Sequence, residues 1–167
     1  MPPWPDNPCR CGWWIPSSWT PRENACVVEL IPLPPAPLTT LWGDAPGPEL
    51  GHAVFTARGA LLRLAPREWL AIGPGDWPGL EAVDVSGAST GWRLRGPDAR
   101  ALLSRGAAID LDARHFPAGH CARTRVARCP AILLARGEGE IDLLAARSYA
   151  PWLQGWLLDA AGVAGLA

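Results

Sequence analysis

Apolar and polar residues alternate regularly only from about residue 52 onward. Between Leu62 and Gly73, apolar side chains flank the turn sequence APRE, which predicts two short strands. Between Val83 and Leu94, apolar positions alternate on both sides of Gly87–Thr90, and this pattern predicts a hairpin. The sequence CARTRVARCPAILLARGEGEIDLLAARS predicts two or three further strands, with a tight turn at Gly137–Gly139.

Helix signals occur in two places. In GPDARALLSRG, Pro97 suits the first helical position, Asp98 favours the positive end of the helix, and Gly106 stops it. The buried stripe is predicted to be Ala99, Leu102 and Leu103, with Arg100 and Ser104 facing outward. The second helix covers RSYAPWLQGWLLDAAGVAG, capped by Ser148 and ended by Gly162. Its predicted apolar face is Trp152, Trp156 and Leu157, with Pro151 in the first turn.

Strands joined mostly by short hairpins, with two helices, predict an α+β fold: an antiparallel sheet with two helices packed on one face. We expect this domain to span residues 51–167. Residues 1–50 are rich in proline and tryptophan, which predicts an irregular arm in which only Ala25–Ile31 favours a strand. The arm either wraps a partner or carries no function.

Charge excludes several functions. The formal net charge is −1, and the 15 basic residues are all arginines, scattered among acids. Nucleic acids and anionic membranes select clustered positive charge, so neither is an expected partner. The lack of lysine excludes Schiff-base chemistry and a P-loop. Without a signal-peptide pattern or a long apolar run, we expect a cytoplasmic protein.

The segment Asp110–Arg125, DLDARHFPAGHCARTR, contains the most reactive-looking side chains. As a metal site it would use His115, His120 and Cys121 with Asp110 or Asp112, but no CxxC or HExxH spacing is present, and adjacent residues of a strand point apart. A Cys–His pair needs an imidazole that is oriented by a third group beside the thiolate; sequence adjacency does not supply this geometry, and no Gly-rich oxyanion loop accompanies it. The favoured interpretation is a shaped loop that feeds a strand, with Phe116 packed inward.

Other candidates are weaker. The five cysteines are an odd number at irregular spacing, and Cys9-x-Cys11 with Cys26 lacks the second pair of a metal knuckle. GPGDWPG lacks the lysine and the strand-to-helix context of a phosphate loop. Ser86–Thr90 lacks a nucleophile elbow. No catalytic, cofactor-binding or metal-binding residue is therefore assigned.

As an ordered set, Leu62–Gly73, Val83–Ala127 and Ile141–Gly165 resemble the gamma subunit of heterotetrameric sarcosine oxidase. The P-x-E-W-L turn of that family is matched at 66–70, and its Arg-Ser-Tyr/Phe-Ala segment at 147–150. The remaining matches are Gly96-Pro97, Asp110-Leu111, Phe116-Pro117, Thr124 and Trp156-Leu157. No convincing match covers the first fifty or so residues.

The resemblance implies a fold similar to the folate-binding aminomethyltransferase domain of the glycine cleavage system. It also implies a structural subunit without its own active site, which packs on the large subunit. The complex oxidises sarcosine to glycine, produces hydrogen peroxide and passes a one-carbon unit to tetrahydrofolate. Its partners are the alpha, beta and delta subunits, to which FAD, FMN, NAD, tetrahydrofolate and zinc belong. Arginines and aromatics are favoured in interfaces, so the interface candidates are Arg114, Phe116 and Arg147.

Two other functions stay open at this point. One is a stand-alone folate-binding protein of the aminomethyltransferase type. The other is a metal- or thiol-dependent protein that uses Cys9, Cys11, His115, His120 and Cys121.

Overall fold

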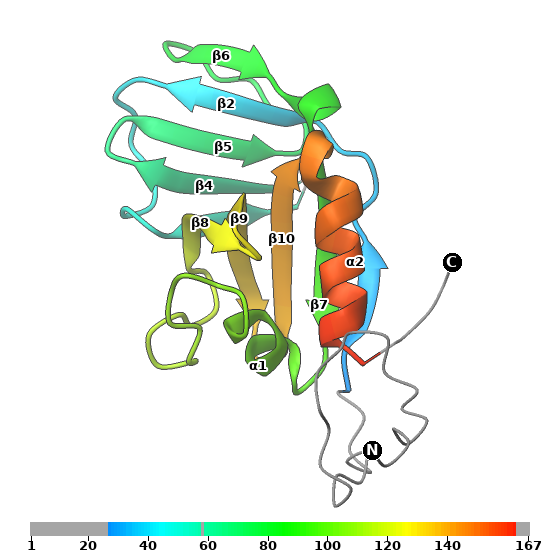
Figure 1. Ribbon diagram of the computed structural model, residues 1–167. Helices are drawn as coiled ribbons and strands as arrows, with labels where there is room; N and C mark the ends of the chain where they lie inside the picture. The colour runs from blue at the N-terminus through cyan, green and yellow to red at the C-terminus, as the bar shows by residue number, and fades with distance from the viewer. Residues whose placement is uncertain (1–26, 58, 163–167) are drawn as a thin grey trace, which may run out of the picture.

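The computed structural model describes residues 27–57 and 59–162, which form two five-stranded antiparallel sheets and two α-helices (Figure 1). Sheet A has the order β1 (Glu29–Pro32), β7 (Ser89–Arg95), β10 (Glu140–Ala146), β9 (Cys129–Gly137) and β8 (Cys121–Val126). Sheet B has the order β3 (Ala53–Thr56), β4 (Gly59–Ala65), β5 (Glu68–Ile72), β2 (Leu38–Trp42) and β6 (Glu81–Asp84). The helices are α1 (Ala99–Ser104) and α2 (Ala150–Ala160), and short 3₁₀ turns cover Ser86–Ala88 and Arg147–Tyr149.

Sheet A is the central layer because its strands carry apolar side chains on both faces. Ile141, Leu143 and Ala145 on β10 face the two helices and join the largest core cluster. Leu144 points the other way and packs against Leu62 and Leu70 of sheet B. The helices therefore cover one face of sheet A and sheet B covers the other, with the strands of sheet B running across those of sheet A (Figure 1). The predicted α+β class and the placing of both helices on one face are confirmed, whereas the second sheet was not predicted.

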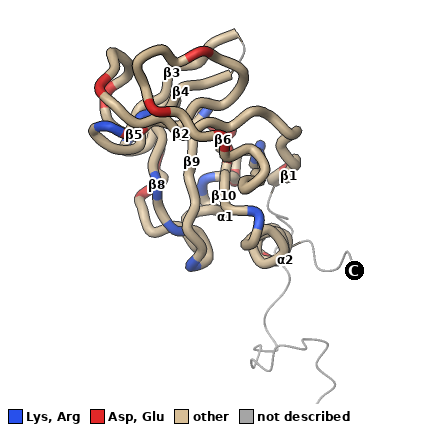
Figure 2. Tube along the Cα trace, turned by 90° about the horizontal axis from the view of Figure 1, so that it is seen from above, with Lys and Arg blue, Asp and Glu red and all other residues tan. Residues whose placement is uncertain are grey.

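Backbone contacts and an ion pair join the two sheets at one side. A single bridge connects His52 with His120, and the N–H of Cys121 donates to the carbonyl of Gly51 at 2.7 Å. Arg123 on β8 donates to both carboxylate oxygens of Glu68 on β5. Figure 2 shows arginine positions along β8 and acidic positions on sheet B and its loops. The two sheets thus form one connected unit.

The strand and helix predictions hold at several sites. β4 and β5 form the predicted pair around the APRE turn, and Gly137–Gly139 lies at the predicted turn between β9 and β10. α1 begins two residues after Pro97, and its buried residues are the predicted Ala99, Leu102 and Leu103. No helix within the described residues is long and apolar enough to cross a membrane.

The predicted hairpin across Gly87–Thr90 is wrong. β6 pairs with β2 in sheet B, whereas β7 pairs with β1 and β10 in sheet A. The chain changes sheets because the carboxylate of Asp84 accepts from the N–H and the hydroxyl of Ser86, which turns the backbone away from β6. The Ser86 Oγ also accepts from the N–H of Leu38 at 2.8 Å. A short-range turn thus replaces the expected strand pairing.

β1 overlaps the predicted strand Ala25–Ile31, whereas β2 lies in a part of the chain that was expected to be irregular. β1 pairs with β7, and β2 lies between β5 and β6. Leu38 and Leu41 of β2 are buried. The proline-rich segment 33–37 connects the two strands and carries the chain from sheet A to sheet B. Both sheets therefore begin before residue 51, while residues 1–26 lie outside the described part.

Candidate functional site

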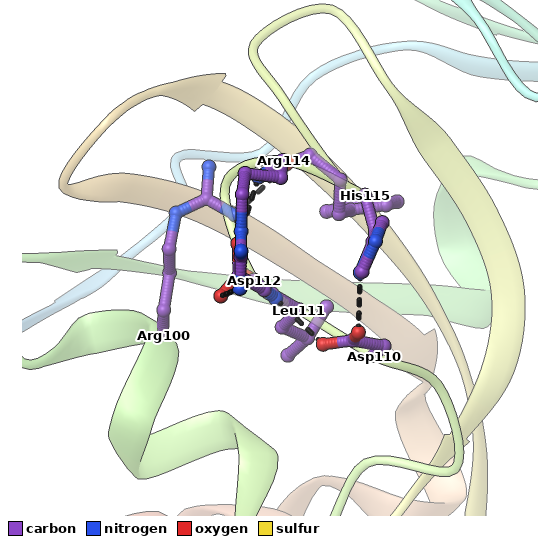
Figure 3. A network of polar contacts seen from close by, with 7 residues as sticks. Arg100, Asp110, Leu111, Asp112, Arg114 and His115 are labelled. Carbon is purple, nitrogen blue, oxygen red and sulfur yellow. Dashed lines mark hydrogen bonds and ion pairs between the residues drawn. The ribbon is translucent and has the colours of Figure 1, made fainter.

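The polar side chains of the loop after α1 bind one another (Figure 3). The carboxylate of Asp110 accepts from the N–H of Asp112 and contacts Nδ1 of His115. Asp112 accepts from the backbone N–H and the guanidinium of Arg114, at 2.9–3.0 Å. These hydrogen bonds lower the pKa of both aspartates, that of Asp112 chiefly through Arg114 and that of Asp110 chiefly through the Asp112 N–H. The charged side chains of this loop therefore bind one another and the backbone of the loop.

Arg100 fastens this loop to the rest of the molecule. It projects from α1 and donates to the carbonyls of Leu111 and Phe116, both at 2.8 Å. It also donates to the carbonyls of Glu138 and Gly137 at the β9–β10 turn. The expectation that Arg100 faces outward is therefore wrong, because its guanidinium turns toward these four backbone carbonyls.

His120 and Cys121 have separate surroundings, as expected for adjacent residues where a strand begins. The His120 ring lies 4.2 Å from that of His52, centroid to centroid, and its buried Nδ1 has no hydrogen-bond partner among residues 27–57 and 59–162. The Cys121 thiol is buried and points toward the Arg63 carbonyl, with Sγ 3.8 Å from that oxygen. Burial raises the pKa of Cys121 to about 11, so the thiol is protonated at neutral pH.

The Cys121 thiol is therefore expected to resist alkylation. At pH 8 its thiolate fraction is roughly a hundredfold below that of an exposed cysteine, and burial limits access further. Native protein treated with iodoacetamide and digested should show the Cys121 peptide largely unmodified, whereas protein unfolded in guanidinium should show it fully modified. Equal modification rates in the two samples would contradict the burial of this thiol.

The other metal and thiol candidates are not brought together. Among residues 27–57 and 59–162, no group of three or more His, Cys, Asp or Glu side chains is placed to hold a metal ion. Cys9, Cys11 and Cys26 lie outside the described residues.

The three interface candidates differ in accessibility. Arg114 leaves 81% of its side chain exposed beside Asp112. Phe116 is only 5% exposed and belongs to the main core cluster, so it is not a surface anchor. Arg147 lies at the surface and donates to the carbonyls of Gly87 and Ser89, which fixes its guanidinium over the 3₁₀ turn that precedes β7.

Sequence reasoning missed a buried ion cluster, formed by Arg93, Arg136 and Asp142, on the sheet B side of sheet A. The Asp142 side chain is 1% exposed, and its two oxygens accept from Arg93 at 2.7 and 3.1 Å. Arg136 donates its Nε–H to the same carboxylate. Arg93 also contacts Glu140 at 3.1 Å, and Asp142 helps to raise the Arg93 pKa. We call these three residues the Asp142 cluster.

The strand register explains why these residues meet. Asp142 on β10 lies directly opposite Arg93 on β7, so their side chains leave the sheet on the same face. Between β9 and β10 the register shifts next to Glu140 and Ile141, and this irregularity places Arg136 beside Asp142. One signal in the sequence could have indicated the cluster: in EIDLLAA, Asp142 lies on the same face of the strand as the apolar Leu144.

The Asp142 cluster lies in the wall of a cavity of about 690 Å³. The segment 33–37 and the side chains of Ile72 and Leu144 form apolar parts of the wall. Arg147, Asp84 and Ser86 contribute further polar groups. The cavity therefore combines a hydrophobic wall with a cluster of guanidinium groups.

Comparison with known proteins identifies the family. Residues 79–163 match the model of the sarcosine oxidase, gamma subunit family. This range runs from just before β6 to just past the end of α2. Comparison with curated proteins gives no match.

The fold also resembles a chain in a solved structure, that of heterotetrameric sarcosine oxidase from Corynebacterium sp. U-96 in complex with pyrrole 2-carboxylate. The TM-score is 0.74 at 21% identity, over 86% of this chain and 90% of that chain. The structural likeness thus includes sheet B strands that lie before the residues matched by the family model. This chain belongs to the sarcosine oxidase gamma subunit family.

Proposed function

We propose that this chain is a structural subunit of a heterotetrameric sarcosine oxidase, without an active site of its own, which packs on the large subunit in the cytoplasm. The observation that carries the proposal is its membership of the gamma subunit family. The fold likeness, over 90% of a chain in such a heterotetramer, is consistent with it. Family membership does not favour the alternative of a stand-alone folate-binding protein.

The surroundings of the reactive-looking residues support a structural role. The Cys121 thiol is buried and protonated, and the Asp110 and Asp112 carboxylates bind groups of their own loop. Leu111 and Phe116 anchor that loop in the core. A nucleophile needs a deprotonated or base-activated group that is open to substrate, and these residues do not supply one.

In this proposal the complex oxidises sarcosine and transfers the one-carbon unit to tetrahydrofolate. FAD, FMN, NAD and tetrahydrofolate are held by the alpha, beta and delta subunits. The likeness to a folate-binding aminomethyltransferase domain stays a prediction about the finer fold. It concerns evolutionary relation and does not assign a folate site to this chain.

Co-expression tests this assembly. An affinity-tagged copy of this chain, produced together with the other three subunits, is expected to retain them through size-exclusion chromatography in equal amounts. The assembled fraction should contain flavin and oxidise sarcosine, whereas this chain purified alone should do neither. Elution of this chain as a separate species in the presence of its partners would refute the proposal.

Arg114 provides a test of the contact surface. We expect Arg114→Ala to weaken retention of the large subunit, because an exposed arginine beside a rigid loop suits an interface. Arg67→Ala is the matched control, since Arg67 is 70% exposed and also bound to a neighbouring aspartate, Asp44. Equal retention by both variants would exclude Arg114 from the interface while leaving the proposed assembly intact.

A further inference from the structure

Arg136 enters the cavity with unused hydrogen-bonding capacity. Only its Nε–H has a polar partner, the carboxylate of Asp142, and its two terminal nitrogens have none within the described residues. The guanidinium carbon lies 5.2 Å from the centre of the Phe55 ring, a cation–π contact that restricts its position. A guanidinium held in this way presents two parallel N–H groups that match a carboxylate.

Unused hydrogen-bond donors on two arginines of the cavity wall favour an anion. Three arginines contribute to the wall, together with the carboxylates of Asp84 and Asp142, and Arg93 is also bound to Glu140 at 3.1 Å. Asp142 is occupied on both oxygens by Arg93 and Arg136. Within the described part of the chain, Arg147 is bound only to backbone carbonyls and pairs with no carboxylate. The terminal N–H groups of Arg136 and the guanidinium of Arg147 are therefore available to a bound anion.

The rest of the wall is apolar. Leu33, Leu38, Ile72 and Leu144 contribute to it, together with the prolines of the segment 33–37. A volume of about 690 Å³ is within the usual size of small-molecule sites, which combine such walls with a few polar groups. The ring of a ligand would displace water from these side chains, while its charge would remain at the arginines.

We propose that this cavity binds a small organic anion with a flat apolar body, such as an aromatic carboxylate, whose carboxylate faces Arg136 and Arg147. The site goes beyond the proposed structural role and does not depend on it. The buried Asp142 cluster holds Arg136 in place, the neighbouring wall accommodates the ring, and Arg147 adds a second cation at the surface.

Calorimetric titration of the full chain with 2-naphthoate, compared with 2-naphthamide, tests the proposal. The two probes share a ring system and differ in charge. One equivalent of naphthoate is expected to bind, at least about tenfold more tightly than the amide, because hydrogen bonds to a charged group are worth more than neutral ones. Equal affinity of the two probes, or no saturable binding of naphthoate, would overturn the proposal.

Variants locate the binding. Arg136→Gln and Arg147→Gln should each weaken naphthoate binding by about tenfold, whereas Arg67→Gln, on the distant β4–β5 turn, should leave it unchanged. Arg136→Gln also alters the Asp142 cluster and can therefore impair folding. Arg147→Gln removes contacts to two backbone carbonyls only, so this variant still tests the proposal if Arg136→Gln folds poorly. Naphthoate affinity unaffected by Arg147→Gln would overturn the proposed orientation.

Naphthoate binding to the assembled complex is the last test. Naphthoate should bind the co-purified complex with the same dependence on Arg147. If the free chain binds the probe and the complex shows no Arg147-dependent binding, a partner subunit covers the cavity, and the small-molecule proposal fails. That outcome leaves the proposed assembly standing, whereas failure of co-purification bears on the assembly alone.

Discussion

Replacing Asp142 with alanine is expected to lower the free energy of unfolding by about 3–5 kcal/mol, because Arg93 and Arg136 lose the buried carboxylate that both contact. The Asp142 carboxylate is 1% exposed, and the side chains of Arg93 and Arg136 are 24% and 26% exposed. Removing the anion leaves Arg136 without its carboxylate partner and Arg93 with Glu140 alone, and the two neighbouring guanidinium groups then repel each other. Urea unfolding followed by tryptophan fluorescence measures the change.

Two comparisons make this result specific. Asp44→Ala removes a carboxylate from the exposed pair with Arg67 and should cost no more than about 1 kcal/mol. Replacing all three members of the Asp142 cluster by leucine or methionine should restore much of the lost stability, because no charge is then left buried. A loss for Asp142→Ala no larger than that for Asp44→Ala would contradict the buried cluster.

Substituting Gly96 with alanine is expected to lower the free energy of unfolding by about 2–4 kcal/mol, since it combines strained backbone with a steric clash. Gly96 has φ +139°, which residues with a side chain rarely adopt. A Cβ at this position would lie 2.1 Å from the carbonyl oxygen of Val27. Relieving the clash would require the backbone at β1 or at the entrance to α1 to move, and thermal unfolding measures the cost.

Gly155 is the control for this substitution. It lies within α2, and in the described part of the chain no atom outside its own helix and its chain neighbours is within 4 Å of the position of its Cβ. Gly155→Ala should stabilise the protein by roughly 0.5–1 kcal/mol, because alanine loses less backbone entropy in a helix than glycine does. If Gly96→Ala lowered the free energy of unfolding no more than Gly155→Ala does, this result would contradict the close approach of Gly96 to the Val27 carbonyl.

Local signals predicted much of the fold but little of its layering. The stop at Gly106, the buried stripe of α1 and the alternation along β10 depend on neighbouring residues and were readable. The separation of β6 from β7 was not readable, because both strands alternate in the same way and the turn at Asp84 decides which sheet each joins. The choice between two sheets depends on contacts distant in sequence.

The face of α2 shows the same limit. The buried residues are Leu153 and Leu157, with Trp156 partly buried, whereas the predicted Trp152 is 63% exposed and donates its indole N–H to the Ala127 carbonyl. Trp156 fits because Gly106 has no side chain: a Cβ there would lie 2.5 Å from the ring. The space available to Trp156 thus depends on a glycine fifty residues earlier in the chain.

The candidate site was the least predictable part. The loop from Asp110 was correctly interpreted as shaped by its apolar residues, since Leu111 and Phe116 are buried. The Asp142 cluster needed three strands and an irregular register to form. Arg93 and Arg136 therefore looked like ordinary surface arginines in the sequence.

The connection through the segment 33–37 has a consequence for the order of folding. The strands of sheet B occupy one continuous stretch, from Leu38 to Asp84, and this stretch lies between β1 and the remaining strands of sheet A. During synthesis, sheet B can pair its strands as they leave the ribosome, while β1 waits for β7 and β7 for β10. A nascent chain arrested before residue 89 would thus hold a complete set of sheet B strands and an unpaired β1, an edge that a chaperone or a partner subunit can bind first.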